Sequence, residues 1–265
     1  RQRRHDALDE LCTHAAVTPD HPDNFITTWN TANPGTSNDN QITIPGTGGG
    51  YNYEIYWEDT ASSTINGTTT LITSSSYTLT FPAPGIYEVQ ASGTFPRIFF
   101  NNGGDKDKIL TVEQWGDIEW VSMSQAFFGV SNLRIPATDA PDLRGVTSMN
   151  NLFLRAVSFN DSINHWDVSN VTNMRQAFGA ATSFNQPLDS WDVSRVTNFD
   201  EMFRGASAFN QPLNSWVTAS ATIMSQMFQY AGEFNQPIDN WNVSGVSNLS
   251  RMFNQASSFN QDIAS

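Results

Sequence analysis

The chain has 265 residues, of which 38% are hydrophobic and 15% are charged. Thirteen Lys and Arg residues stand against 26 Asp and Glu residues, so the formal net charge is −13 at pH 7. This charge excludes proteins that bind nucleic acid or anionic membranes by neutralising phosphates. The one cysteine, Cys12, excludes an internal disulfide framework and any zinc cluster built from cysteines. No apolar run reaches transmembrane length, and we expect no direct membrane insertion.

Residues 1–24 are polar and mixed, and we expect a linker or tail here. They contain His5, Cys12, His14 and His21, whose gaps fit no compact zinc-ligand pattern. The chain starts without an initiator Met and without a signal peptide, which indicates a processed piece.

Residues 25–114 show the two-residue period of β-strands. Tyr51, Tyr53, Ile55 and Trp57 fall on one face of a predicted strand. Further short strands are expected at 42–44, 71–72, 77–81, 87–89 and 98–100, with turns at 34–40, 45–50, 61–68, 82–85 and 101–104. This spacing predicts an all-β, sandwich-like domain.

Residues 115–265 consist of one unit repeated six times, first at 115–140 and then at 141–165, 166–190, 191–215, 216–240 and 241–265. Three residue types recur in register at steps of 25: Trp166, Trp191, Trp216 and Trp241; Phe153, Phe178, Phe203, Phe228 and Phe253; and Asn160, Asn185, Asn210, Asn235 and Asn260. Such a repeat predicts a solenoid, with the asparagines forming a hydrogen-bonded ladder between units.

Each unit is expected to hold a short strand followed by a short helix. The strand has the spacing of a leucine-rich repeat, and the helix has an apolar stripe behind an N-cap at Thr197 or Asn198. The residues are Leu188, Trp191, Val193 and Val196 for the strand, and Phe199, Met202, Phe203 and Ala206 for the helix. The predicted fold class is α+β: a short N-terminal segment, an all-β sandwich-like domain, then a leucine-rich-repeat-like β/α solenoid.

The run NVTNMRQAF…SFNQPLDSWDVS resembles the BspA-like leucine-rich repeats of bacterial cell-surface proteins, a family with related repeats in mycoplasma-type lipoproteins. Residues 53–59 and 84–93 are similar to polycystic-kidney-disease-type (PKD-like) modules of surface proteins. The resemblance implies an exported, extracellular adhesion protein with no enzymatic activity, whose partner is a host-cell or matrix surface protein or a glycan. We expect residues 25–114 to cover the apolar end of the solenoid.

One row of outward residues is the predicted ligand-binding face. It contains Asp142, Asp167, Asp192 and Asn242, flanked by His165, Ser169, Ser194 and Ser244. Concave strand faces are the usual binding surfaces of solenoids. An ordinary solvated face is the alternative.

Two further kinds of site are weaker candidates. Asn101, Asp105 and Asp107 offer oxygen ligands to Ca²⁺, with a solvated loop as the alternative, and no other cofactor is expected. The tryptophan column is expected in the core. Trp120, which is expected to be exposed, and the Tyr-rich strand 51–57 are the candidates for stacking on sugars.

The sequence leaves two functions open. The first is a surface adhesion or recognition module that binds through the solenoid face. The second is a structural spacer without a ligand, whose repeats continue beyond Ser265 into more chain or another subunit. We expect no enzyme, because no constellation of acid, base and nucleophile occurs.

Overall fold

The computed structural model describes residues 17–263. His5, Cys12 and His14 lie outside this range. Of the predicted linker, residues 17–24 are described, and the Val17 N–H donates a hydrogen bond to Glu54, 3.0 Å from N to Oε2. This contact covers the side of the strand opposite Tyr53 and Ile55, which explains why Glu54 is buried as well as its two neighbours.

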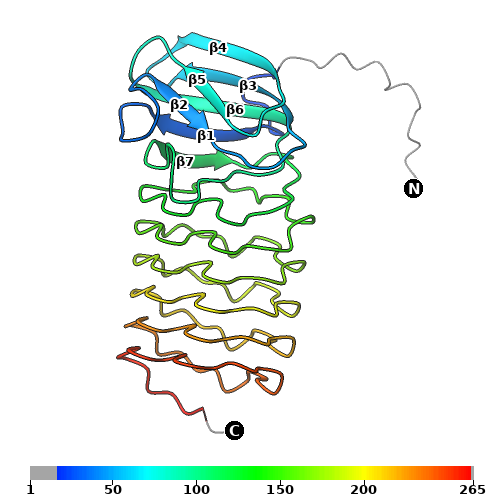
Figure 1. Cartoon of the computed structure of the whole chain (residues 1–265), viewed down its shortest axis with the longest axis vertical. Helices are drawn as coiled ribbons and strands as arrows, with labels where there is room; N and C mark the ends of the chain where they lie inside the picture. The colour runs from blue at the N-terminus through cyan, green and yellow to red at the C-terminus, as the bar shows by residue number, and fades with distance from the viewer. Residues whose placement is uncertain (1–16, 264–265) are drawn as a thin grey trace, which may run out of the picture.

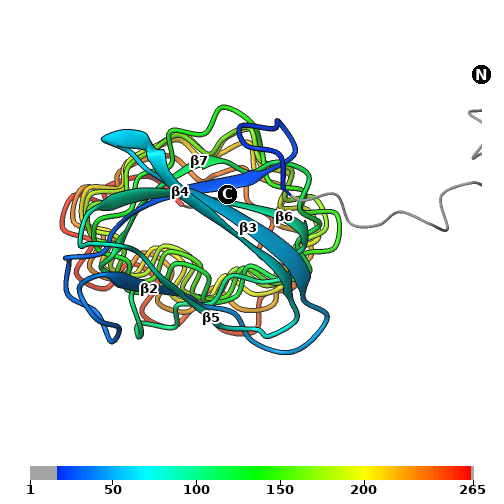
Figure 2. The same ribbon diagram turned by 90° about the horizontal axis from the view of Figure 1, so that it is seen from above.

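Two antiparallel sheets form one end of the molecule (Figure 1). The larger sheet has the order β4-β3-β6-β1-β7, and the smaller one pairs β2 with β5. The strands are β1 (Phe25–Asn30), β2 (Gln41–Ile44), β3 (Asn52–Asp59), β4 (Ser62–Ile72), β5 (Tyr77–Thr80), β6 (Ile86–Thr94) and β7 (Ile109–Gln114). Seen from above, the smaller sheet lies across from the larger one (Figure 2).

Several local predictions for this part need correction. Residues 61–68 were expected to be a turn, yet they belong to the long strand β4. Residues 98–100 were expected to be a strand and form none. Their backbone instead runs over the first repeat unit, where the Phe100 N–H donates to Ala126 O at 3.2 Å.

The six repeat units form six layers, stacked beneath the sheets (Figure 1). We number them layer 1 (115–140), layer 2 (141–165), layer 3 (166–190), layer 4 (191–215), layer 5 (216–240) and layer 6 (241–263). Single-residue parallel bridges join Ser148, Asn173, Asn198, Ile223 and Asn248 in turn. The layers therefore lie in register, and their outlines superimpose in Figure 2.

The predicted α+β class and β/α solenoid are wrong. The described residues contain no helix and are all-β, with the named strands confined to residues 25–114. No strand forms at 188–196 either, where the chain makes turns. Between residues 17 and 263, then, no helix is long and apolar enough to span a membrane.

Backbone hydrogen bonding explains why the helices do not form. In layer 3 the N–H groups of Gln176, Phe178 and Ala180 donate to carbonyls of layer 4 at 2.7–2.9 Å. The intervening N–H groups donate three residues back, which makes tight turns instead of the four-residue bonds of an α-helix. Gln176 and Ala180 also have φ values of 53° and 52°, in the left-handed region that interrupts a right-handed helix.

The burial pattern of the repeat was predicted correctly although its conformation was not. Phe199, Met202, Phe203 and Ala206 are fully buried, and the phenylalanines stack in columns along the molecule. The Phe203 ring lies 5.4 Å from that of Phe178 and 5.6 Å from that of Phe228, between centroids. Consecutive turns thus place side chains three and four residues apart on the core side, as a helix would.

The asparagine ladder is confirmed. Asn185, Asn210, Asn235 and Asn260 each donate a backbone N–H to the side-chain oxygen of the asparagine 25 residues earlier, at 2.8–2.9 Å. Each ladder bond satisfies a backbone group that no strand or helix satisfies. The asparagines therefore fix the spacing of the layers at one edge.

Candidate functional site

The predicted ligand-binding face lies at a turn of each layer and not on a strand. Asp142, Asp167, Asp192 and Asn242 each accept a hydrogen bond from the backbone N–H two residues later, at 3.0–3.1 Å. One side-chain oxygen of each residue is therefore used to close a turn. Exposed Val217 separates Asp192 from Asn242 in this row.

Charges on this face are partly compensated. Hydrogen bonds from the Arg144 guanidinium lower the pKa of Asp142, and hydrogen bonds from Ser194 lower the pKa of Asp192. His165 points its Nε2 at the backbone oxygen of Asp139, 3.0 Å away. Of the three aspartates in this row, Asp142 pairs with Arg144, whereas Asp167 and Asp192 form no ion pair with an arginine within residues 17–263. The face is a row of turn-forming residues with two free charges.

The predicted calcium ligands have separate partners. Asp105 is buried and accepts hydrogen bonds from the N–H groups of Thr36, Ser37 and Thr43 at 2.6–3.0 Å. Asp107 pairs with Lys106 at 2.7 Å, and Asn101 accepts from Gln125. Within residues 17–263 no group of three or more His, Cys, Asp or Glu can hold a metal ion. The expectation of a Ca²⁺ site in this loop is therefore not supported.

A lysine supplies the positive charge in this region. The fully buried Lys108 donates from Nζ to the carbonyl oxygens of Ser37, Asn38 and Gln41 at 2.8–3.1 Å, and to Ser37 Oγ at 2.9 Å. The Ser37 hydroxyl in turn donates to Asp105 at 2.7 Å. Asp105 thus binds backbone N–H groups of loop 34–41, and Lys108 binds its backbone carbonyl groups.

The sugar-stacking interpretation of Trp120 is wrong. Trp120 is 1% exposed and contacts the rings of Phe25, Phe95 and Trp115, where the sheets meet layer 1. Tyr51 and Tyr53 are likewise buried. Trp166, Trp191, Trp216 and Trp241 are buried too, which confirms the predicted core role of the tryptophan column.

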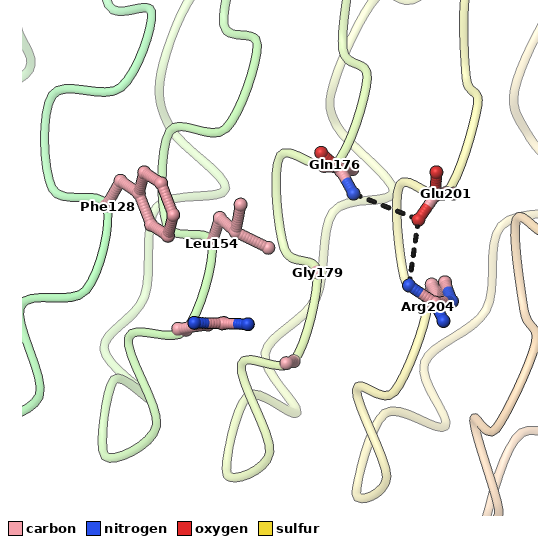
Figure 3. A pocket seen from close by; sticks show the side chains of 8 residues that line it. Phe128, Leu154, Gln176, Gly179, Glu201 and Arg204 are labelled. Atoms are coloured by element: carbon pink, nitrogen blue, oxygen red, sulfur yellow. Dashed lines mark hydrogen bonds and ion pairs between the residues drawn. The ribbon is translucent and has the colours of Figure 1, made fainter. Parts of the chain in front are cut away.

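A hollow of about 230 Å³ opens on the side of layers 1–4 (Figure 3). One part of its lining is apolar and the other part is charged. The lining consists of Phe128, Leu154, Arg155, Gln176, Gly179, Ala180, Glu201 and Arg204. We refer to this feature as the arginine hollow.

Glu201 is the centre of a hydrogen-bonded network beside the hollow. It is 9% exposed and accepts from Gln176 at 2.9 Å and from Arg204 at 3.0 Å, both at Oε2 (Figure 3). Arg175 contacts the other oxygen of Glu201 at 3.3 Å and Asp200 at 3.0 Å. Ser225 donates to the second oxygen of Asp200. The network fixes these polar groups across three layers.

Two guanidinium groups of the hollow keep unused donors. Arg204 uses Nε for Gln229 and one terminal nitrogen for Glu201, both at 3.0 Å. The exposed Arg155 makes no side-chain hydrogen bond or ion pair with the described residues. The hollow therefore presents hydrogen-bond donors and positive charge to solvent.

One of the comparisons with known proteins identifies a family. The model of the family described as "Mycoplasma protein of unknown function, DUF285" matches residues 121–232 and 214–265, together more than half of the chain. The chain belongs to this family. Neither the search of curated proteins nor that of solved structures found a match for this DUF285 protein. The resemblances to BspA-like repeats and to PKD-like modules stay predictions.

The arginine hollow was missed in the sequence, although the DUF285 repeat contains a signal for it. The hollow uses positions where neighbouring units differ: Gly179 and Ala180 stand where the next unit has Arg204 and Gly205. The preceding unit has Leu154 and Arg155 at these positions. A step from large to small to large in the same column predicts a gap, provided that the units lie in register.

Proposed function

We propose that this DUF285 protein is a non-catalytic recognition module that binds a macromolecular partner outside the cell through the side of its layered stack. The observation that carries this proposal is the register of the layers. Bridges and hydrogen bonds at steps of 25 residues hold exposed side chains in fixed rows. Side chains that are fixed before binding lose little conformational entropy in a complex.

The partners that fit are surface proteins of a host cell, matrix proteins or glycans. The resemblance to bacterial surface repeats supports an extracellular location. The net charge of −13 disfavours nucleic acid and anionic lipid, because their phosphates would be repelled. Three arginines, Arg155, Arg175 and Arg204, lie at or beside the arginine hollow, where Arg175 and Arg204 pair with Asp200 and Glu201.

The test is binding of the labelled chain to whole host cells, matrix proteins and a polysaccharide panel, with and without a Ca²⁺ chelator. Saturable binding to one of these would support recognition. Loss with the chelator would point to a cation held by the predicted Asp face. A variant with Asp167→Asn and Asp192→Asn removes two charges and keeps the turn-closing oxygens, so it tests that face without unfolding it.

A spacer is the second candidate. It is favoured by the uniform core, in which five phenylalanines from Phe153 to Phe253 repeat one stacking geometry at 5.4–5.6 Å. A protein that acts as a spacer has to be rigid, but it needs no exposed binding site. A folded chain that binds none of the cells, proteins or polysaccharides would favour the spacer and contradict the recognition proposal.

A further inference from the structure

We propose that the arginine hollow binds the carboxylate side chain of an acidic, otherwise apolar segment of a protein partner. This inference rests on the recognition function proposed above and names the kind of ligand that this part of the stack selects. Four observations carry it: the position of the two arginines, the small residues between them, the remaining hydrogen-bonding capacity, and the charge.

The two arginines stand on either side of layer 3. Arg155 is in layer 2 and its N–H donates to Gly179 O at 2.7 Å, while Ala180 donates to Arg204 O of layer 4 at 2.7 Å. Hydrogen-bonded neighbouring chains lie about 4.8 Å apart, so the backbones of Arg155 and Arg204 lie about 10 Å apart. Both residues line the hollow over layer 3.

The hollow lies over layer 3, where Gly179 has no side chain and Ala180 has only a methyl group. A Cβ atom on Gly179 would lie 2.7 Å from Leu154 Cδ1, so the leucine side chain lies directly against this glycine. At the Gly179 position the following layers have Arg204, Gln229 and Asn254, and at the Ala180 position they have Gly205, Tyr230 and Gln255, so of layers 3 to 6 only layer 3 has small residues at both. Layer 3 is thus the place where a partner's side chain can enter between two arginines.

The side-chain groups of the hollow that make no hydrogen bond are all donors, on Arg155 and Arg204. Gln176 uses its amide nitrogen on Glu201 and its oxygen on Arg175. Both oxygens of Glu201 are occupied by Arg175, Arg204 and Gln176. Sugar hydroxyls need acceptors as well as donors, whereas a carboxylate only accepts. The remaining capacity therefore favours a carboxylate over a sugar.

The apolar part of the lining favours a carboxylate on a hydrocarbon stem. Phe128 and Leu154 lie on one side of the hollow, away from the Glu201 network (Figure 3). The CH₂ groups of a Glu side chain can pack against them while its carboxylate meets the guanidinium groups, which bind carboxylates with paired hydrogen bonds. The lining contains two cations and one anion, in a protein whose net charge is −13. The lining thus carries a net positive charge, opposite in sign to the net charge of the whole chain.

The test uses the full chain labelled with ¹⁵N and a capped five-residue peptide in which Leu and Glu alternate. The matched probe has Gln in place of each Glu. We expect the Glu peptide to shift the side-chain Nε–Hε NMR signals of Arg155 and Arg204 saturably, and the Gln peptide not to do so. Equal shifts with both peptides, or with sulfate at the same concentration, would overturn the assignment of a carboxylate side chain.

Three variants give this test its specificity. Arg155→Gln removes a guanidinium that has no described side-chain partner, and we expect about fivefold weaker binding, the upper range for an exposed charge pair. Ala180→Tyr fills the hollow with a residue that the same column accepts at Tyr230, where φ is 61° against 52° at Ala180. We expect this variant to abolish binding while its thermal unfolding stays cooperative.

Arg251→Gln is the matched control, because exposed Arg251 occupies in layer 6 the register position of Gln176. An equal loss in Arg251→Gln and Arg155→Gln would show non-specific charge attraction and overturn the inference. If the chain binds cells or matrix proteins but the Glu peptide fails to bind and Arg155→Gln keeps full cell binding, this inference is wrong and the recognition function stands. If the chain binds no cell, protein or polysaccharide, the recognition function itself fails.

Discussion

Asp105 and Lys108 are charged residues that belong to the core of the sheet region. Asp105 is 1% exposed and Lys108 is fully buried. Burying a charge is costly unless hydrogen bonds replace its water. Here backbone N–H groups surround the carboxylate and backbone carbonyls surround the ammonium, with the Ser37 hydroxyl bonded to both. The two side chains therefore define the conformation of loop 34–41.

The first prediction concerns the acid stability of the chain. Burial raises the pKa of Asp105, but hydrogen bonds from Ser37, Thr43 and Thr36 outweigh it, so the pKa is below its usual value. The folded state then binds this proton less readily than the unfolded chain. The stability from Asp105 is present above the ordinary pKa of 3.8 and is lost as the pH falls through the lower, folded value.

We expect Asp105→Asn to cost about 2–3 kcal/mol at pH 7, because N–H donors lose a charged acceptor. It should also make the free energy of unfolding fall less steeply below about pH 4. Urea unfolding followed by tryptophan fluorescence from pH 2.5 to pH 7 measures both effects. Glu88→Gln is a control of opposite sign, because burial raises the pKa of Glu88. Identical acid slopes in Asp105→Asn and the original chain would contradict this account.

The second prediction concerns backbone strain at Ala180. This residue has a φ of 52°, which costs an L-residue about 1–2 kcal/mol, whereas glycine adopts it freely. Gly205, at the same position of the next layer, has a φ of 72°. Ala180→Gly should raise the free energy of unfolding by about 0.5–1 kcal/mol once the greater freedom of the unfolded chain is subtracted. Chemical denaturation measures this change.

Ala181→Gly is the neighbouring control for this prediction. Ala181 is fully buried and has no left-handed φ, so the same substitution loses a packed methyl group and gains no backbone relief. We expect it to destabilise the chain by about 1 kcal/mol or more. If both substitutions destabilise equally, the left-handed geometry at Ala180 is not a source of strain.

A single layer is stabilised mainly by the phenylalanine columns. Phe203 is 0% exposed and contacts Phe178 and Phe228 in the adjoining layers and Phe209 in its own layer, the last at 4.1 Å between ring centroids. Without helices or strands in the layer, these contacts and the bonds between layers maintain its shape. A central phenylalanine therefore matters to three layers at once.

The third prediction is that Phe203→Ala costs about 3–5 kcal/mol, the usual range for truncating a fully buried phenylalanine. Phe259→Ala is the matched control, because Phe259 occupies the second phenylalanine column in layer 6 and is only half-buried. We expect it to cost clearly less, since fewer atoms lose contacts. A loss below about 1 kcal/mol for Phe203→Ala, measured by equilibrium unfolding, would contradict its central place in the core.

At this scale the sequence predicted which residues are buried but not how the backbone runs. The spacing of Phe199, Met202, Phe203 and Ala206 is typical of a helix, and consecutive turns reproduce the same spacing. The decisive feature is that alternate N–H groups bond to the next layer, which depends on contacts 25 residues away. Asn198 was predicted as an N-cap, and its side chain does accept from the N–H of Asp200, but a left-handed Glu201 follows and no helix begins.

The sites were less predictable than the core for a similar reason. The sequence indicated that Asp105 can offer oxygen ligands to a cation. It did not indicate that the fold brings loop 34–41 and Lys108 next to this residue. The arginine hollow depends on the small residues Gly179 and Ala180 of layer 3, and the sequence indicates a gap there only once the units are known to lie in register. Repeated columns predict what is constant between units, whereas sites form where the units differ.

The whole molecule has one continuous core from the sheets to layer 6. Phe25 and Phe100 of the sheet region belong to the same buried cluster as Phe228 and Trp241 of the stack. β7 is bridged to layer 1 through Thr111 and Arg134, so the edge of the larger sheet continues into the layers. Each layer contacts chiefly its neighbours, and stability in such an array is a sum of nearest-neighbour terms.

The last prediction concerns how this stability is distributed. Layer 1 is covered by the sheets, where Phe100 and Asn102 donate to Ala126 O and Phe128 O at 3.2 and 2.8 Å. In layer 6 the exposed side chains of residues 242–245 and 247–250 show that no described segment covers its far side. Amide protection should therefore decrease from layers 1 and 2 towards layer 6, because an array opens most easily at its uncovered end.

Hydrogen exchange of the backbone amides measures this gradient. The reporters are Phe153 and Phe178 in layers 2 and 3 and Phe228 in layer 5, because each of these N–H groups donates to a carbonyl of the following layer. Phe203→Ala should accelerate exchange in layers 5 and 6 more than in layers 1 and 2. Layers 1 and 2 stay packed against the sheets when layer 4 loosens, whereas layers 5 and 6 lose the neighbour that orders them. Equal acceleration in all six layers would show that the stack and the sheets unfold as one unit, and that the nearest-neighbour account does not hold for this chain.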